Sequence, residues 1–434
     1  MSDPLRRNLA LFIAFRVLFH ARFYYPVVGV LFLDLGLTLE QYALLNVIWA
    51  VVIIVLEVPS GALADVIGRK RMVVLGAVLM VAEMAVFAFA PTGDPTLLFW
   101  LLVINRVLSG AAEASASGAD EALAFDSLPA RDRQRTWPRV LAALMRWKSG
   151  GFFVAMVSGA VLFDQQLMTT LLGWTGWSPG LGGTTRWPIY ATFATSLVCL
   201  AVALNFREPP APDPSGHHAV GRAWQNVVAG AIQVFTSRRI LFLMAAALLL
   251  DTFIRLFLTF ASNYYRLIEL PPFVNGLIGS GLALLGLAVA PVARAMAGRF
   301  GPVTNYTIIG ATVLLGLVGT AMAWPVWGAW VVVPLGISMS ALQFFTSNYL
   351  NLWADPSIRA TVLSFRGVAF NLGYAAAGLL FAQLTAHLRL THPEAGETAV
   401  FGLALPWLPT VFLGCGLLLG LTLRLTRPRT GRLP

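Results

Sequence analysis

The chain has 434 residues, of which 58% are hydrophobic and only 12% charged. A chain this apolar cannot hide its hydrophobic residues inside a soluble globule, so we expect the lipid bilayer to be its solvent. The formal charge of +10 does not indicate a nucleic-acid partner, because the basic residues sit in short loops between apolar runs.

Apolar runs long enough to cross a bilayer recur along the whole chain. The first run is too long for a signal peptide and has no clear cleavage site, so it should remain as a helix. We therefore predict an all-α polytopic membrane protein with 12 transmembrane helices. Six spans are expected near residues 9–33, 41–63, 72–91, 96–125, 139–163 and 187–206, and six more near 240–265, 272–293, 303–324, 326–351, 360–385 and 401–423.

The basic residues divide unevenly between the two sides of the predicted spans. Loops on the side of the termini carry 20 Lys and Arg residues, whereas the opposite loops carry three, namely Arg186, Arg266 and Arg389. Because cytoplasmic loops are enriched in Lys and Arg, both termini are predicted to be cytoplasmic. The expected location is a bacterial inner membrane or a plasma membrane.

A proline-rich break separates the two sets of six spans. Residues 207–238 begin with Pro209, Pro210, Pro212 and Pro214, which is typical of a linker, and continue with apolar residues at helical spacing. We expect an amphipathic helix there, lying on the inner membrane surface. The flanking bundles, 1–206 and 239–434, resemble weak repeats, since Arg22 aligns with Arg255 and Gly68 with Gly301.

The turn between the second and third spans carries a recognisable motif. It places two glycines, one acid and a cluster of cations in the order Gly61, Asp65, Gly68, Arg69, Lys70 and Arg71. This pattern resembles the corresponding loop of the major facilitator superfamily, in which an acid at the end of the fourth helix often joins the network. The resemblance implies a gating role for Gly61, Asp65, Gly68, Arg69 and Asp126. Val66 departs from the family, which usually has Arg or Lys there.

The fourth span adds a second, shorter resemblance. Arg106 and Gly110 are similar to the family's fourth-helix pattern, in which the arginine is associated with proton coupling. An alternative is that Arg106 simply neutralises a buried acid. Arg106, Glu113 and Asp120 recur every seven residues, which predicts one shared helix face. Buried carboxyl groups favour their protonated form, so the predicted proton carriers are Glu57, Glu83 and Glu113.

Other charges in the fourth and fifth spans are expected to pair. Antiparallel packing of these spans brings Asp120 and Glu121 near the depth of Arg146, and Glu113 near that of Lys148. We interpret Asp120, Glu121, Arg146 and Lys148 as structural ion pairs. Because breaking a buried pair is costly, some of them could exchange partners during gating.

Candidate substrate residues lie on the first span. Arg16, His20 and Tyr24 share one helix face at four-residue spacing, with Arg22 roughly 120° around the helix from Arg16. A cation and an imidazole on one face suit an anionic substrate or a proton site. The alternative is that Arg16 reaches the inner interface and His20 is a satisfied interior donor.

The second half supplies the remaining substrate candidates. Asp251 and Arg255, four residues apart, form either a self-contained pair or part of a substrate site. Asn348 offers a neutral hydrogen-bonding group in the tenth span, and Arg366 a cation in the eleventh. The cations favour an anionic solute, yet the acids within the spans could cancel their charge.

The sequence contains no nucleotide-binding loop or catalytic constellation, so we do not expect an enzyme. Cys199 and Cys415 lie in apolar runs without ligand partners, and we predict no metal and no cofactor. The family resemblance implies a secondary active transporter that moves a small organic solute by alternating access, coupled to protons, and acts as a monomer. Open alternatives are an uncoupled facilitator, a multidrug/proton antiporter, which the lack of a Gly-Pro pair in the fifth span disfavours, and a non-transporting receptor of the same fold.

Overall fold

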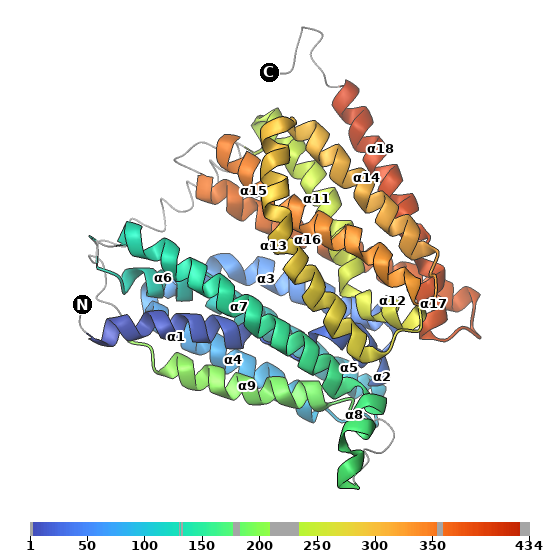
Figure 1. The fold of residues 1–434 in the computed structure, drawn as a ribbon, viewed down its shortest axis with the longest axis horizontal. Helices are drawn as coiled ribbons and strands as arrows, with labels where there is room; N and C mark the ends of the chain where they lie inside the picture. The colour runs from blue at the N-terminus through green and yellow to red at the C-terminus, as the bar shows by residue number, and fades with distance from the viewer. Residues whose placement is uncertain are drawn as a thin grey trace.

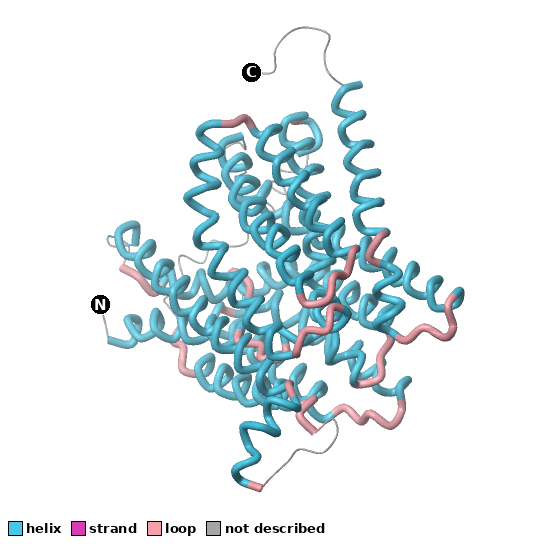
Figure 2. Tube along the Cα trace, turned by 45° about the vertical axis from the view of Figure 1, so that its right-hand side comes forward, coloured by secondary structure: helices cyan, strands magenta, loops and turns pink. Residues whose placement is uncertain are grey.

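The computed structural model describes residues 3–129, 131, 133–176, 183–208, 234–353 and 359–425. Helices make up nearly all of these residues, and no strand occurs among them (Figure 2). Within the described ranges, 12 helical spans are long and apolar enough to cross a membrane. The prediction of an all-α polytopic membrane protein is therefore confirmed.

The N-terminal half contains the first six spans (Figure 1). Some spans are split into two helical segments. The elements are α1 (Asp3–His20), η1 (Tyr25–Val27), α2 (Val28–Asp34), α3 (Leu39–Ile67), α4 (Arg69–Phe89), α5 (Pro95–Ala116), α6 (Ala119–Asp126), α7 (Arg133–Phe163), α8 (Gln165–Leu172), η3 (Gly173–Thr175) and α9 (Trp187–Leu204).

The C-terminal half repeats this plan with six further spans. Its elements are α11 (Arg238–Thr259), α12 (Ala261–Leu267), α13 (Pro272–Arg299), α14 (Pro302–Ala321), η5 (Trp327–Val332), α15 (Val333–Trp353), α16 (Arg359–Thr391), α17 (Glu397–Ala404) and α18 (Trp407–Leu425). The predicted bounds 1–206, 207–238 and 239–434 stay a prediction. The expected surface helix falls mainly on residues 209–233, which lie outside the described part of the chain.

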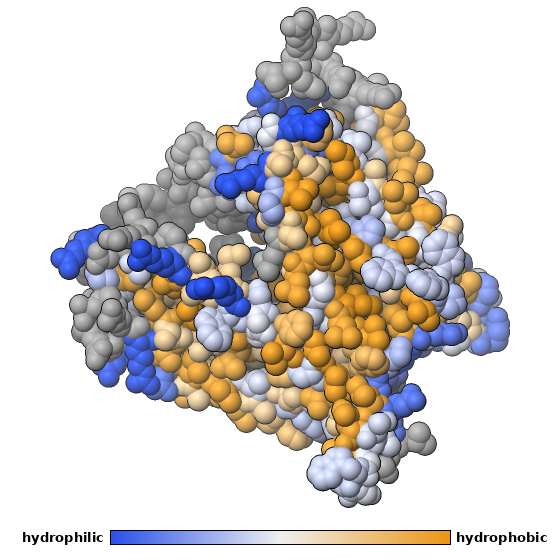
Figure 3. Space-filling model, in the orientation of Figure 1, coloured by the Kyte–Doolittle hydropathy of each residue, from blue (hydrophilic) through white to orange (hydrophobic). Residues whose placement is uncertain are grey.

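The two halves meet at one end and diverge toward the other. In Figure 1 they converge around α2, α12 and α17, which we call the closed end, and separate where α1 begins and α18 ends, which we call the open end. The halves touch mainly through α3 against α16 and α7 against α13. Apolar side chains cover the middle of the face in Figure 3, with hydrophilic ones near the helix ends, as a bilayer requires.

Close backbone contact holds the halves together at the closed end. The backbone N–H of Gly29 donates to Ser262 Oγ across the interface at 3.0 Å. A Cβ atom on Gly29 would lie only 1.9 Å from Asn263 Oδ1, and one on Gly276 only 2.3 Å from the carbonyl oxygen of Met156. These two positions therefore require glycine while the closed end is shut.

The fourth span is not one continuous helix. Helix α5 ends at Ala116, and Gly118 adopts a left-handed φ of 76° before α6 begins. The chain changes direction there, because only glycine takes up such a conformation without steric cost. The predicted shared face of Arg106, Glu113 and Asp120 is therefore wrong, since Asp120 belongs to a separate helix.

Candidate functional site

A cavity of about 550 Å³ lies in the C-terminal half, between α11, α15 and α16. We call it the charged cavity. It is lined by Asp251, Arg255, Gln343, Thr346, Ser347, Arg366, Gly367, Phe370 and Asn371. Three predicted substrate residues thus come together, namely Asp251, Arg255 and Arg366. Asn348 does not line the cavity. The wall on α15 is formed instead by Gln343, Thr346 and Ser347, which share one helix face.

Two neighbouring side chains bind the guanidinium of Arg255. Its Nη2 lies 2.7 Å from Asp251 Oδ2, and its Nη1 donates to Asn371 Oδ1 at 2.9 Å. The guanidinium also lies over the ring of Tyr374, 5.5 Å from the centroid. By contrast, Arg366 has no hydrogen bond or ion pair to any residue that the structure describes. The free cation of this cavity is therefore Arg366.

In the N-terminal half, Asp120 pairs with α1 instead of α7. Arg16 Nη2 donates to Asp120 Oδ1 at 2.8 Å, and a second contact joins Arg16 Nε to Asp120 Oδ2. The predicted pairing of Asp120 and Glu121 with Arg146 is wrong, because Glu121 and Arg146 are exposed. The break at Gly118 turns Asp120 toward α1.

Arg22 and Glu83 form a second buried pair. Arg22 Nη1 lies 2.8 Å from Glu83 Oε1, and the two side chains are 4% and 0% exposed. Tyr24 is also buried, packed edge-on against Phe87 with ring centroids 5.3 Å apart. This burial leaves no face of Arg22 or Tyr24 for a solute, which contradicts their predicted role in substrate binding. It also opposes the predicted proton-carrying role of Glu83, whose charge is matched.

Glu113 differs from these paired acids. It is half-buried and has no ion pair among the described residues, although the charges of Arg22, Arg16 and Lys148 act on it. His20 lies in the same field of Lys148 and Arg16. No ion pair joins Glu113 to Lys148 among the described residues, although the charges of Lys148 and Arg16 act on both Glu113 and His20.

Arg106 and Glu57 occupy contrasting surroundings. Arg106 is only 6% exposed, and its guanidinium lies 4.9 Å from the ring centroid of Phe32. No described carboxylate pairs with it, so the alternative that Arg106 neutralises a buried acid gains no support. Glu57 is exposed on α3.

At the open end, the motif loop is held by two acids. Arg69 forms an ion pair with Asp126 and donates from Nη1 to the carbonyl of Ala122 at 3.1 Å. Glu208 accepts hydrogen bonds from the backbone N–H groups of Arg69 and Lys70, each at 2.8 Å, and so caps α4.

The structure describes contacts for some of the predicted gating residues, and their gating role stays a prediction. Gly68 adopts a φ of 99° at the turn into α4, where glycine avoids strain. The surroundings of Gly61 and the side chain of Asp65 lie outside the described part of α3. Sequence reasoning missed Glu208, since a single acid after Arg207 carries no motif.

Five charged residues join the halves at the closed end. Arg266 binds Asp34 through two hydrogen bonds of 2.6 and 2.7 Å. Arg389 binds Glu40 at 2.8 and 3.0 Å and Glu397 at 2.6 and 2.7 Å. We call Asp34, Glu40, Arg266, Arg389 and Glu397 the closed-end latch.

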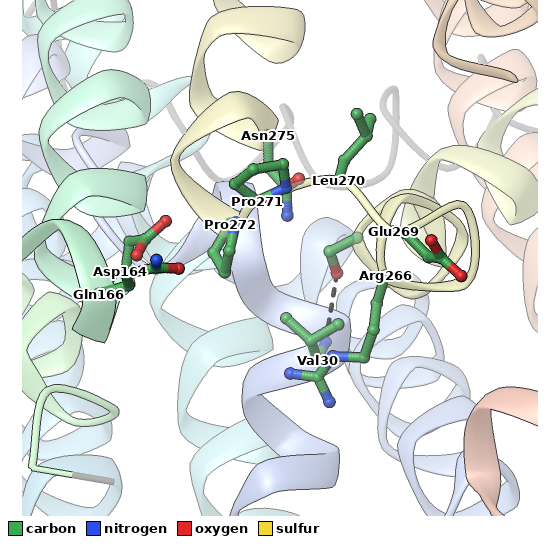
Figure 4. A pocket seen from close by; sticks show the side chains of 10 residues that line it. Val30, Asp164, Gln166, Arg266, Glu269, Leu270, Pro271, Pro272 and Asn275 are labelled. Carbon is green, nitrogen blue, oxygen red and sulfur yellow. Dashed lines mark hydrogen bonds between the residues drawn. The ribbon is translucent and has the colours of Figure 1, made fainter. Parts of the chain in front are cut away.

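Beside the latch lies a smaller cavity of about 370 Å³ (Figure 4). Asp164 and Gln166 line one side of it, and Arg266 and Glu269 the other. Asp164 Oδ2 accepts a hydrogen bond from the backbone N–H of Phe273 at 3.2 Å, which adds another link between the halves.

Twelve spans in two halves, joined at one end and parted at the other, with a charged cavity in the C-terminal half, define the fold of a membrane transporter. The chain belongs to the Major Facilitator Superfamily, whose sequence profile matches residues 10–378. The similar proteins that carry a described activity are transporters, which agrees with the prediction that the chain is not an enzyme.

Known proteins with similar sequences and structures agree with this assignment. An uncharacterized MFS-type transporter of Mycobacterium tuberculosis (strain H37Rv) is 26% identical over 401 residues, covering 86% of this chain and 54% of the relative. The chain thus spans about half the length of the curated relatives it matches.

Solved structures show the same fold. A D323A mutant of the nucleoside transporter NupG superposes with a TM-score of 0.72 and 13% identity, covering 96% of this chain and 98% of that one. An inward-facing, unoccupied bacterial homologue of the human lysosomal transporter Spinster superposes with a TM-score of 0.69 and 15% identity, covering 96% of each chain. A D-xylose–proton symporter superposes with a TM-score of 0.63 and 14% identity, covering 93% of this chain and 96% of that one.

Proposed function

We propose that the protein is a proton-coupled secondary active transporter that moves a small organic solute by alternating access. The observation that carries this proposal is the arrangement of the halves, which are latched by ion pairs at the closed end and separated at the open end. Releasing the latch would let a rocking motion expose the space between the halves to the opposite side.

The distribution of basic residues orients the protein. The open end carries the start of α1, the end of α18 and the arginine-rich loops, so the positive-inside rule assigns it to the cytoplasm of a bacterial inner membrane or plasma membrane. The conformation described here is then the inward-facing one. Nothing in the proposed cycle requires a second copy, and we propose a monomer.

Proton coupling is assigned to Glu113. An unpaired, half-buried carboxyl group in a field of cations can release and accept a proton as those cations move. Glu83 is fixed to Arg22, and Glu57 is open to the surroundings, which makes both weaker candidates. A proton-coupled neighbour, the D-xylose–proton symporter, shows that this fold is compatible with such coupling.

The test is solute-driven proton movement in proteoliposomes that contain a pH-sensitive dye. Sugars, nucleosides, short peptides, carboxylates and amines are added in turn. We expect at least one class to move protons, and Glu113→Gln to abolish this movement while leaving the protein folded. The matched control is Glu121→Gln, which removes an exposed acid from α6.

Other outcomes would point to the remaining functions. Solute flux that ignores a pH gradient would identify an uncoupled facilitator, and binding without flux a receptor. Proton movement elicited only by structurally unrelated hydrophobic drugs would indicate a multidrug antiporter. Undiminished proton dependence in Glu113→Gln would remove Glu113 as the carrier.

A further inference from the structure

We propose that the solute is a small organic monoanion whose carboxylate binds Arg366 in the charged cavity. This inference rests on the proposed transport function and names the substrate class of its site. It follows from which charges in the cavity are matched and which one is not.

The wall of the charged cavity contains three ionisable groups. Asp251 and Arg255 form an ion pair at 2.7 Å, Arg255 also donates to Asn371 and lies over Tyr374, and the charge of Arg366 acts on Asp251 without an ion pair between them. Arg366 is the remaining charge, and no described residue binds it. The described lining residues of the cavity therefore carry a net charge of one positive unit.

A lone cation at membrane depth is energetically unfavourable unless water or an anion matches it. The planar guanidinium of Arg366 presents parallel N–H donors that fit both oxygens of a carboxylate. A monoanion would thus leave the site neutral. A cation would be repelled, and a dianion would bring one charge more than the wall can match.

The rest of the wall suits the body of an organic molecule. Gln343 and Ser347 offer neutral hydrogen-bonding groups on α15, and Phe370 offers an aromatic surface one turn from Arg366 on α16. A cavity of about 550 Å³ has the size of a metabolite site. Besides the Asp251–Arg255 pair, its described lining combines one unpaired charge with neutral groups, as expected for a site that binds a carboxylate joined to a partly apolar body.

The experiment measures thermal unfolding of the full-length protein in a neutral detergent at pH 7. The probes are three matched pairs, acetate and acetamide, benzoate and benzamide, and nicotinate and nicotinamide, together with the dianion succinate. We expect at least one monocarboxylate to raise the midpoint, while its amide has no effect. Arg366→Gln should weaken binding of that acid about 10- to 100-fold. Arg366→Lys should weaken it less, since Lys keeps the positive charge but lacks the parallel N–H donors of the guanidinium.

A second substitution gives an effect of opposite sign. Asp251→Asn removes the acid that neutralises Arg255, so the cavity gains a second net positive charge. Succinate should then bind more tightly than to the unchanged protein, whereas a merely structural role of these residues would make both substitutions weaken every probe. Arg299→Gln is the matched control, because it removes an exposed arginine at the open end of α13.

Three results would overturn the proposal: stabilisation by amides equal to that by acids, unchanged acid binding in Arg366→Gln, or no response to any monocarboxylate. The dye assay separates this proposal from the transport function. Proton movement driven by a neutral solute would support the proposed transport function and contradict an anionic substrate. Binding of an acid that depends on Arg366, without any flux of that acid, would support the carboxylate site at Arg366 and contradict the proposed transport function.

Discussion

Replacing Arg389 by Gln should release the closed end. Arg389 on α16 pairs with Glu40 on α3, across the interface between the halves, and with Glu397 on α17 within its own half, so one substitution removes both pairs but only one link between the halves. It also leaves the two carboxylates close together with no cation between them. We expect the population to shift away from the inward-facing state.

The size of the shift follows from the burial of the three side chains. Arg389 is 30% exposed, Glu40 20% and Glu397 26%, so the pairs are partly screened by water. At the upper end of the range for exposed pairs, each contributes about 1 kcal/mol. Because Arg389 and Glu397 both belong to the C-terminal half, only the Arg389–Glu40 pair breaks when the halves separate, and its loss changes the conformational equilibrium by about 1 kcal/mol, or roughly 5-fold in population.

Pulsed electron paramagnetic resonance between two spin labels measures this shift. Thr92→Cys and Glu394→Cys place labels on exposed loops of opposite halves at the closed end. The native cysteines are first replaced by Cys199→Ala and Cys415→Ser. The fraction of long distances should rise in Arg389→Gln, and the effect should shrink at high salt, which already weakens the native pairs.

Arg186→Gln is the matched control. Arg186 also lies at the closed end, but it donates to the carbonyls of Ala88 and Ala90 within its own half. It should leave the distance distribution unchanged. An Arg389→Gln distribution identical to that of the unmodified protein, at low salt, would refute the idea that these charges hold the halves together.

Three further substitutions test other parts of the structure. Gly29→Ala places a methyl group 1.9 Å from Asn263 Oδ1, so the same spin-label pair should report a closed end that no longer shuts; an unchanged distribution would contradict the required contact. Glu83→Gln leaves Arg22 buried without its anion and should destabilise the protein by about 3–5 kcal/mol, seen as a lower unfolding midpoint. Glu208→Gln weakens the cap of α4 and should lower the stability of that helix end by about 1 kcal/mol, measured as faster amide hydrogen exchange at the start of α4; an unchanged exchange rate would contradict the capping role.

Apolar periodicity was sufficient to predict the helices, since a bilayer imposes the length of each span. The observed α3, Leu39–Ile67, contains the predicted 41–63, and α9 begins at the predicted residue, Trp187. Boundaries differ where polar helix continues beyond the membrane, as at the start of α7, Arg133. Composition could not reveal the break at Gly118, because a single glycine is also compatible with a continuous helix.

Partners of charged groups were harder to predict than the groups themselves. Spacing identified Asp251 and Arg255 because they lie one turn apart on one helix. It could not identify the contact between Glu40 and Arg389, which are 349 residues apart and meet only when both halves are assembled. For the same reason the sequence suggested Arg146 for Asp120, whereas the folded chain selects Arg16.

The charged cavity is built entirely from α11, α15 and α16 of the C-terminal half, whereas Glu113 belongs to α5 of the N-terminal half. In the mechanism that we propose, recognition of the solute and coupling to the ion gradient are therefore located in separate bundles. Substitutions on three helices could retune which compound is carried, over evolutionary time or by engineering, while the machinery that draws on the ion gradient stays intact.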